Sequence, residues 1–163
     1  RKLKVSEVEI EKMISQFQEH QKLERAEDER KGAATSNIRP KSLPWPLKGK
    51  LVGTYGQHKD PTTGLNIFKK GIEISTVIEG AQVNSVLDGN VQFAGEIPGM
   101  GQVMILEHPH SLYTIYAGLK EMLKKVGDVV KSGEKLGAVG SQSPLYFEIR
   151  ARNVAMDPVR WLE

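Results

Sequence analysis

The feature that most constrains the fold is the regular spacing of turn residues along the second part of the chain. From Leu47 onward, short apolar runs alternate with turns rich in Gly, Asp and Asn. Such runs are typical of short strands, and Asp88-Gly89 predicts a hairpin between two of them. The predicted strands lie at residues 51–52, 71–74, 82–86, 90–94, 102–106, 112–116, 126–130, 134–139 and 143–150. We therefore expect a mainly β domain, a β-sandwich or a partly open barrel.

The stretch before these strands has a different pattern. Residues 5–31 contain neither Gly nor Pro and are rich in charge. Their apolar residues, together with Leu3, recur at spacings near three, four and seven, which predicts an amphipathic helix. Members of this stripe are Leu3, Ile10, Met13, Ile14, Phe17 and Leu23. The helix is either the end of a coiled coil or an element that docks onto the following domain, and the sequence favours neither.

These patterns divide the chain into three parts. Residues 1–31 form the helical segment, and residues 32–45 form a linker of small and polar residues that ends in prolines. Residues 46–163 form the β domain. The chain starts without Met or a signal peptide, so we expect it to be the interior of a longer protein.

Composition excludes several classes of function. Cysteine is absent, so disulfides and thiolate metal sites are excluded. A net charge of +3 with no arginine-rich block argues against a nucleic-acid partner. No apolar run approaches the roughly 20 residues that span a bilayer.

The β region resembles the LytM, or lysostaphin-like, zinc endopeptidases that cut peptidoglycan. The resemblance rests on the order and spacing of several short motifs, each weak alone. They are found at residues 60–64, 69–74, 80–83, 88–95, 99–105, 116–119, 126–133, 137–141 and 143–150. It implies a LytM-type domain from Pro46 to the C-terminus.

The zinc-binding residues of that family are replaced here. The family carries His-x-Gly-x-Asp, Tyr-Ala-His-Leu and His-x-His; three of these residues bind zinc and two histidines assist catalysis. The matching positions hold Lys69, Glu73, Gly118, Pro144 and Tyr146. A catalytic zinc needs three protein ligands, and only Glu73 could serve as one. We therefore expect a degenerate domain with no metal, no cofactor and no peptidase activity.

The last strand supplies candidate partner-binding residues. Period-two alternation places Pro144, Tyr146, Glu148 and Arg150 on one face, which the resemblance identifies with the floor of the substrate groove. Tyr and Arg are enriched at binding hot spots. The expected partner-binding set is Tyr146, Arg150, Lys70, Lys69, Tyr116 and Glu148. Alternatively, Arg150 is a solvated charge at the strand end and Tyr146 fills the space of the lost zinc.

A second His-x-His pattern lies at His108-Pro109-His110. No third metal ligand is adjacent to it in sequence, and Pro favours a turn. We interpret this segment as a solvent-exposed turn and not as a relocated metal site.

A LytM domain without zinc ligands, preceded by a helical segment, resembles the EnvC-type murein hydrolase activators. The resemblance implies a non-catalytic periplasmic protein that activates an N-acetylmuramoyl-L-alanine amidase during daughter-cell separation. It also implies coupling to a cell-division ABC transporter complex and a helix that restrains the groove, for which residues 5–31 are the candidate. The alternative function is a non-catalytic peptidoglycan-binding module.

Overall fold

The computed structural model describes residues 9–16 and 40–163. The remaining parts of the expected helix, with Leu3, Phe17 and Leu23, and the first part of the expected linker lie outside these residues. Within the described residues, no helix is long and apolar enough to cross a bilayer.

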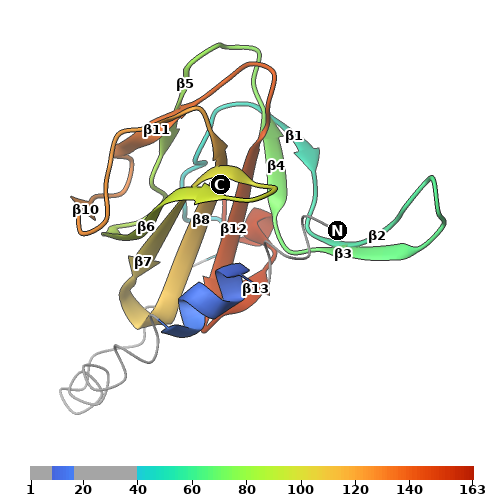
Figure 1. Ribbon diagram of the computed structural model, residues 1–163, viewed down its shortest axis with the longest axis horizontal. Helices are drawn as coiled ribbons and strands as arrows, with labels where there is room; N and C mark the ends of the chain where they lie inside the picture. The colour runs from blue at the N-terminus through green and yellow to red at the C-terminus, as the bar shows by residue number, and fades with distance from the viewer. Residues whose placement is uncertain (1–8, 17–39) are drawn as a thin grey trace.

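The domain is built on one large antiparallel sheet (Figure 1). Its strand order is β1-β4-β12-β8-β7-β6-β10, and β13 pairs with β12. The strands are β1 (Lys50–Gly53), β4 (Ile72–Ser75), β6 (Gly89–Ile97), β7 (Gly101–His108), β8 (Leu112–Leu119), β10 (Val129–Val130), β12 (Leu145–Ala151) and β13 (Val154–Met156). The longest strands, β6, β7, β8 and β12, are adjacent and alternate buried side chains between the two faces.

A smaller sheet covers the inner face of the large one. Its order is β5 (Ala81–Asn84), β11 (Lys135–Val139) and β9 (Glu121–Met122). The core between the two sheets includes Val83 and Val139 from the small sheet and Ile72, Met104 and Phe147 from the large one. The sheets do not close into a barrel, and the prediction of a mainly β domain, a β-sandwich or a partly open barrel, is confirmed.

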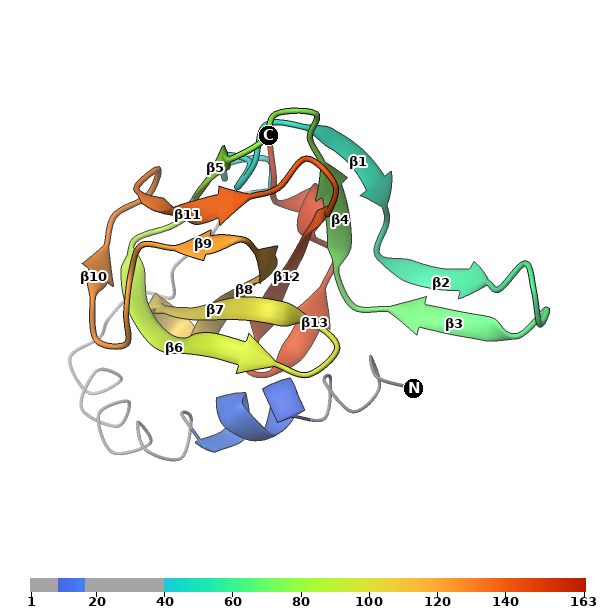
Figure 2. The same cartoon turned by 45° about the horizontal axis from the view of Figure 1, so that its top comes forward.

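A two-stranded hairpin projects from one side of this sandwich (Figure 2). It consists of β2 (Gly56–Lys59) and β3 (Asn66–Lys69), which pair with each other. Tyr55 anchors its base: the ring meets Phe68 edge-on at a centroid distance of 5.2 Å, and the hydroxyl donates to the Ala155 carbonyl at 3.2 Å. The hairpin ends at Lys69 and leads directly into Lys70.

The two ends of the β domain are tied together. Leu43 forms a parallel bridge with Leu162, and Trp45 Nε1 donates to the Glu163 carbonyl at 2.6 Å. Short 3-10 helices, η1 (Pro109–Ser111) and η2 (Pro158–Arg160), complete the structure. The chain therefore joins the sandwich beside its own C-terminal segment.

The expected exposure of the His108-Pro109-His110 turn was wrong for its first histidine. His108 is the last residue of β7 and is 3% exposed. Its Nδ1 donates to the Asp88 carbonyl at 2.7 Å, so its Nε2 is the acceptor for the Thr114 hydroxyl at 2.7 Å. Burial lowers the pKa of His108 to about 4, which keeps the ring neutral.

The lowered pKa of His108 predicts that the stability of the fold depends on pH. The pKa of His108 is lower in the folded state than in the unfolded state, so His108 contributes its full stabilisation above about pH 6.5. This contribution is lost as the pH falls toward 4. Between pH 7 and pH 5 the free energy of unfolding should drop by roughly 2 kcal/mol. Urea unfolding at the two pH values measures this loss. A His108→Gln variant should lose much less, and an equal loss would contradict the assignment.

Candidate functional site

The outer face of the large sheet, away from the small sheet, carries a second buried cluster. Alternation along β7 and β8 brings Val103, Ile105, Tyr113, Ile115 and Ala117 to this face. Phe93, Met100 and Tyr146 pack at its edges, partly buried. An apolar sheet face of this kind needs a cover, because exposing it to water is costly.

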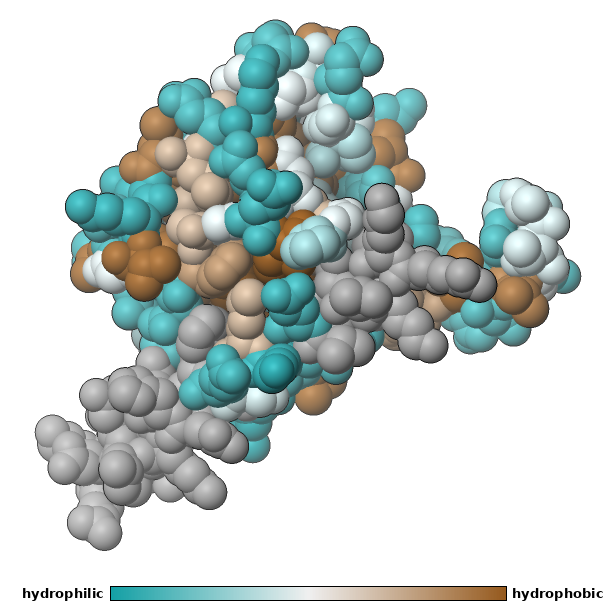
Figure 3. Space-filling view, in the orientation of Figure 1, coloured by the Kyte–Doolittle hydropathy of each residue, from teal (hydrophilic) through white to brown (hydrophobic). Residues whose placement is uncertain are grey.

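Residues 9–16, the arm helix, provide that cover (Figures 1 and 2). Ile10 and Ile14 are four residues apart and so lie on one side of the helix; both are 0% exposed in the cluster of the outer face. Lys12, Ser15 and Gln16 are exposed. The surface over the helix is hydrophilic in Figure 3, in keeping with an amphipathic helix lying on the sheet.

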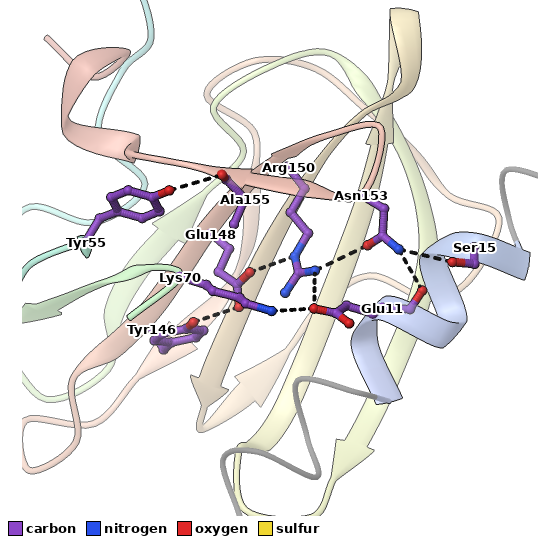
Figure 4. Close-up of polar contacts among 9 residues, drawn as sticks. All are labelled: Glu11, Ser15, Tyr55, Lys70, Tyr146, Glu148, Arg150, Asn153 and Ala155. Carbon is purple, nitrogen blue, oxygen red and sulfur yellow. Dashed lines mark hydrogen bonds and ion pairs between the residues drawn. The ribbon is translucent and has the colours of Figure 1, made fainter. Parts of the chain in front are cut away.

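Polar contacts fix the arm helix at the edge of this face (Figure 4). The Glu11 carboxylate accepts a hydrogen bond from Lys70 and lies 3.8 Å from Arg150 Nη1. The pKa of Glu11 is lowered, chiefly because Lys70 donates to it. Asn153 Nδ2 donates to the Glu11 backbone carbonyl at 2.9 Å and lies 3.1 Å from Ser15 Oγ. The β domain therefore contacts both the charged side chain and the backbone of Glu11 in the arm helix.

Beneath these contacts, β12 carries a buried ion pair. Glu148 and Arg150 are both 0% exposed, and Arg150 Nε donates to Glu148 Oε1 at 2.7 Å. The other Glu148 oxygen accepts from the Tyr146 hydroxyl at 2.7 Å. Arg150 Nη1 donates to Asn153 Oδ1 at 3.2 Å, whereas Nη2 has no hydrogen-bond partner among the described residues. One guanidinium nitrogen is thus buried without an acceptor.

The positions that correspond to zinc-binding and catalytic residues lie beside this network. Tyr146 of β12 pairs directly with Glu73 of β4, and Lys69 ends β3. Pro144 is exposed just before β12. Gly118 has φ +84, and a Cβ there would lie 3.0 Å from the Pro144 carbonyl oxygen, so a side chain at this position would be strained.

These residues do not fit a catalytic zinc. Glu73 is the only carboxylate among the five positions, and no group of three His, Cys, Asp or Glu that could hold a metal exists within residues 9–16 and 40–163. A catalytic zinc site takes three such ligands and keeps a fourth position open.

The structure separates the expected partner-binding residues into three groups. Lys70 and Tyr146 are partly buried at the outer face, and Lys69 is partly buried at the end of β3. Glu148 and Arg150 are on the same face but fully buried, so the interpretation of Arg150 as a solvated charge was wrong. Tyr116 was also misplaced: it is 0% exposed on the inner face, packs against Phe147 at 5.2 Å and accepts from the Val86 amide.

Sequence reasoning missed the contacts of Glu11 and Asn153. Asn153 adopts a left-handed conformation with φ +64 in the turn between β12 and β13. Asn tolerates this conformation better than most residues, so a turn after Arg150 was predictable. Its contact with Glu11, 142 residues away in sequence, was not.

Comparison with known proteins places this arrangement in a family. Residues 67–158, more than half of the chain, match the model of peptidase family M23. The chain belongs to peptidase family M23. Among solved structures it is similar to a zinc containing peptidase from Vibrio cholerae, with 28% identity and a TM-score of 0.66 over 74% of this chain and 40% of that one. The catalytic domain of lysostaphin from Staphylococcus simulans is 25% identical, with a TM-score of 0.56 over 68% and 89%.

The similar curated proteins include murein hydrolase activators. Murein hydrolase activator EnvC of Escherichia coli is 32% identical over 123 residues, 72% of this chain and 28% of EnvC. Murein hydrolase activator NlpD of Escherichia coli is 29% identical over 72% of this chain and 30% of NlpD. Cell division protein DipM of Caulobacter vibrioides is 30% identical over 71% and 19%. The chain spans less than a third of the length of these relatives.

The site geometry predicts that the protein does not bind zinc unless ligands are restored. After incubation with zinc and gel filtration, the natural chain should retain below ~0.1 zinc per chain by elemental analysis, because Glu73 alone is too weak a site. Lys69→His, Glu73→Asp and Tyr146→His together should raise this toward ~1, since they rebuild three ligands. A matched triple variant with Lys59→His in place of Lys69→His should not gain zinc, because residue 59 lies away from the other two substituted residues. Stoichiometric zinc in the natural chain would contradict this assignment.

Proposed function

We propose that this protein is a non-catalytic activator of a peptidoglycan amidase, an N-acetylmuramoyl-L-alanine amidase, in cell-wall remodelling and daughter-cell separation. It acts in the periplasm and binds the amidase through the outer face of the large sheet. Two lines of support are its similarity to proteins named murein hydrolase activators and the poor fit of its residues to zinc.

The observation that carries the proposal is the arm helix itself. An amphipathic helix of this chain lies on the face that corresponds to the substrate groove and buries Ile10 and Ile14 there. A surface that accepts one short amphipathic helix is suited to a second one of similar pattern. In the proposed mechanism the arm helix holds the surface closed, and its release lets a helix of the amidase take its place.

The energy of the arm contacts fits a reversible restraint. Burial of two isoleucines contributes about 2 to 3 kcal/mol each, and ordering of the short helix offsets part of this. The Glu11 contacts are partly exposed and add little by comparison. A pull on the segment ahead of the helix, by a cell-division ABC transporter complex or another partner, would then release it.

After release, the proposed contact surface combines apolar and polar residues. Ile97, Val103, Ile105 and Ile115 would receive the apolar side of the amidase helix. Of the partner-binding residues expected from sequence, Tyr146, Lys70 and Arg150 would contact the amidase helix here, with Lys69 next to Lys70 in the chain, and Glu148 would support Tyr146 and Arg150 from below. Tyr116 does not belong to it, because it faces the inner core.

Opening the arm helix should raise amidase stimulation. Ile10→Asp with Ile14→Asp places two carboxylates in an apolar cluster, so the helix should leave the sheet and the surface become available. We expect stimulation of a purified amidase, measured by release of dye-labelled peptidoglycan fragments, to increase at least several-fold over the natural chain.

The matched control is Lys12→Asp, which adds negative charge on the exposed side of the same helix. It should behave like the natural chain. Equal stimulation by the natural and opened proteins would mean that the helix does not restrain this surface. Binding of the opened protein to purified peptidoglycan without any amidase stimulation would favour the peptidoglycan-binding alternative.

A further inference from the structure

Three side chains from separate segments surround the Glu11 carboxylate and the adjacent helix backbone (Figure 4). Lys70 follows β3, Arg150 lies on β12, and Asn153 lies in the turn after β12. Together they form the acid cradle. Lys70 and Arg150 supply positive charge to the carboxylate, and Asn153 donates to the Glu11 carbonyl.

The arm helix fills this cradle incompletely. Glu11 lies 3.8 Å from Arg150 Nη1, beyond hydrogen-bond range, and contacts it only as a charge. Arg150 Nη2 is buried and has no acceptor among the described residues. A guanidinium can bind a carboxylate through two parallel hydrogen bonds, so Arg150 retains binding capacity that Glu11 does not use.

The buried neighbour Glu148 sets both the charge and the geometry of the cradle. It binds Arg150 through Nε; Nη1 donates to Asn153 Oδ1, and Nη2 has no acceptor among the described residues. Glu148 also offsets one of the two positive charges of Lys70 and Arg150. The remaining single positive charge suits one carboxylate and not two. Glu148 is therefore a positioning residue for Arg150.

We propose that the acid cradle recognises one acidic side chain on the helix of the partner, and that the arm helix is a weaker built-in mimic of that helix. The pattern is read from the arm itself: an apolar residue, an acidic residue directly after it, and a second apolar residue four positions after the first, as in Ile10, Glu11 and Ile14. This inference rests on the proposed function, because it names what the same surface selects in the partner.

The test uses peptides with the sequence of residues 5–20 as probes, with either Glu or Gln at position 11. The receptor is the full chain carrying Ile10→Asp, Glu11→Gln and Ile14→Asp, so that its own arm cannot compete. We expect the Glu peptide to bind about ten-fold more tightly than the Gln peptide in fluorescence anisotropy. The reason is that the Gln peptide loses the charge-assisted hydrogen bond to Lys70 and the charge contact with Arg150. A Glu peptide with Lys12→Gln serves as the control and should bind like the parent, since Lys12 is exposed.

A second receptor carries Lys70→Met in addition. Lys70 is partly exposed, so this change should leave the fold intact, whereas removing the buried Arg150 could unfold the domain. The preference for Glu over Gln should fall to less than about three-fold, because one of the two cations is gone. Equal binding of the two peptides to the first receptor, no binding of either, or an unchanged preference in the Lys70→Met receptor would each overturn the acid cradle.

No amidase is present in this assay, so its result is separate from that of the proposed function. A preference for the Glu peptide together with no amidase stimulation by the opened protein would support recognition by the acid cradle and contradict the proposed amidase activation. Stimulation by the opened protein with no such preference would retain the amidase and reject the cradle.

Discussion

The burial of the large sheet on both faces is the constraint on which the rest of the structure depends. Strands β7, β8 and β12 lie in the middle of the sheet, and their side chains alternate between two apolar clusters. The inner cluster is covered by the small sheet of the same domain. Within residues 9–16 and 40–163, the outer cluster is covered not by a second sheet but by two turns of helix that contribute two isoleucines. The inner cover is a sheet of the same domain, whereas the outer cover buries only a few side chains, which is what the proposed exchange for a partner helix requires.

The ion pair of Glu148 and Arg150 beneath the arm helix belongs to the folded domain itself and cannot be removed without cost. Glu148 and Arg150 are fully buried, and removal of one partner of such a pair typically costs about 3 to 5 kcal/mol because the other charge is left unpaired. Substitutions at Arg150 therefore report on folding as well as on binding. Tyr146 and Lys70 are better sites for separating the two effects, because both are partly exposed and neither carries a fully buried charge.

Much of this fold was predictable, because strand alternation and turn residues are local signals. The alternation in β12 correctly separated Tyr146, Glu148 and Arg150 from Leu145, Phe147 and Ile149. The same alternation, applied to β7, places His108 inside with Met104 and Leu106, whereas the following Pro109 favours an exposed turn; the structure follows the alternation.

The errors arose where local signals end. Tyr116 was assigned to the outer face because it lies near Gly118, yet the register between β7 and β8 shifts between Gln102 and Val103, and Gly118 has a positive φ. Nearness to Gly118 in the sequence therefore does not place Tyr116 on the outer face. The spacing of Ile10 and Ile14 predicted an apolar stripe, but the surface that it covers depends on contacts between residues far apart in sequence. The extent of burial at Arg150 depends on those same contacts.

The tie between Leu43 and Leu162 also bears on how a pull on the chain would reach the domain. Tension applied ahead of residue 9 reaches the arm helix before it reaches residue 40, since the helix comes first along the chain. The load that passes onward meets the parallel bridge and the Trp45 contact with Glu163 at the point where the chain joins the sandwich. In the proposed mechanism, tension would therefore act first on the arm helix and then on this junction, which lies outside the central strands of the large sheet. The helix could then leave the sheet without any strand of the sheet having to unpair.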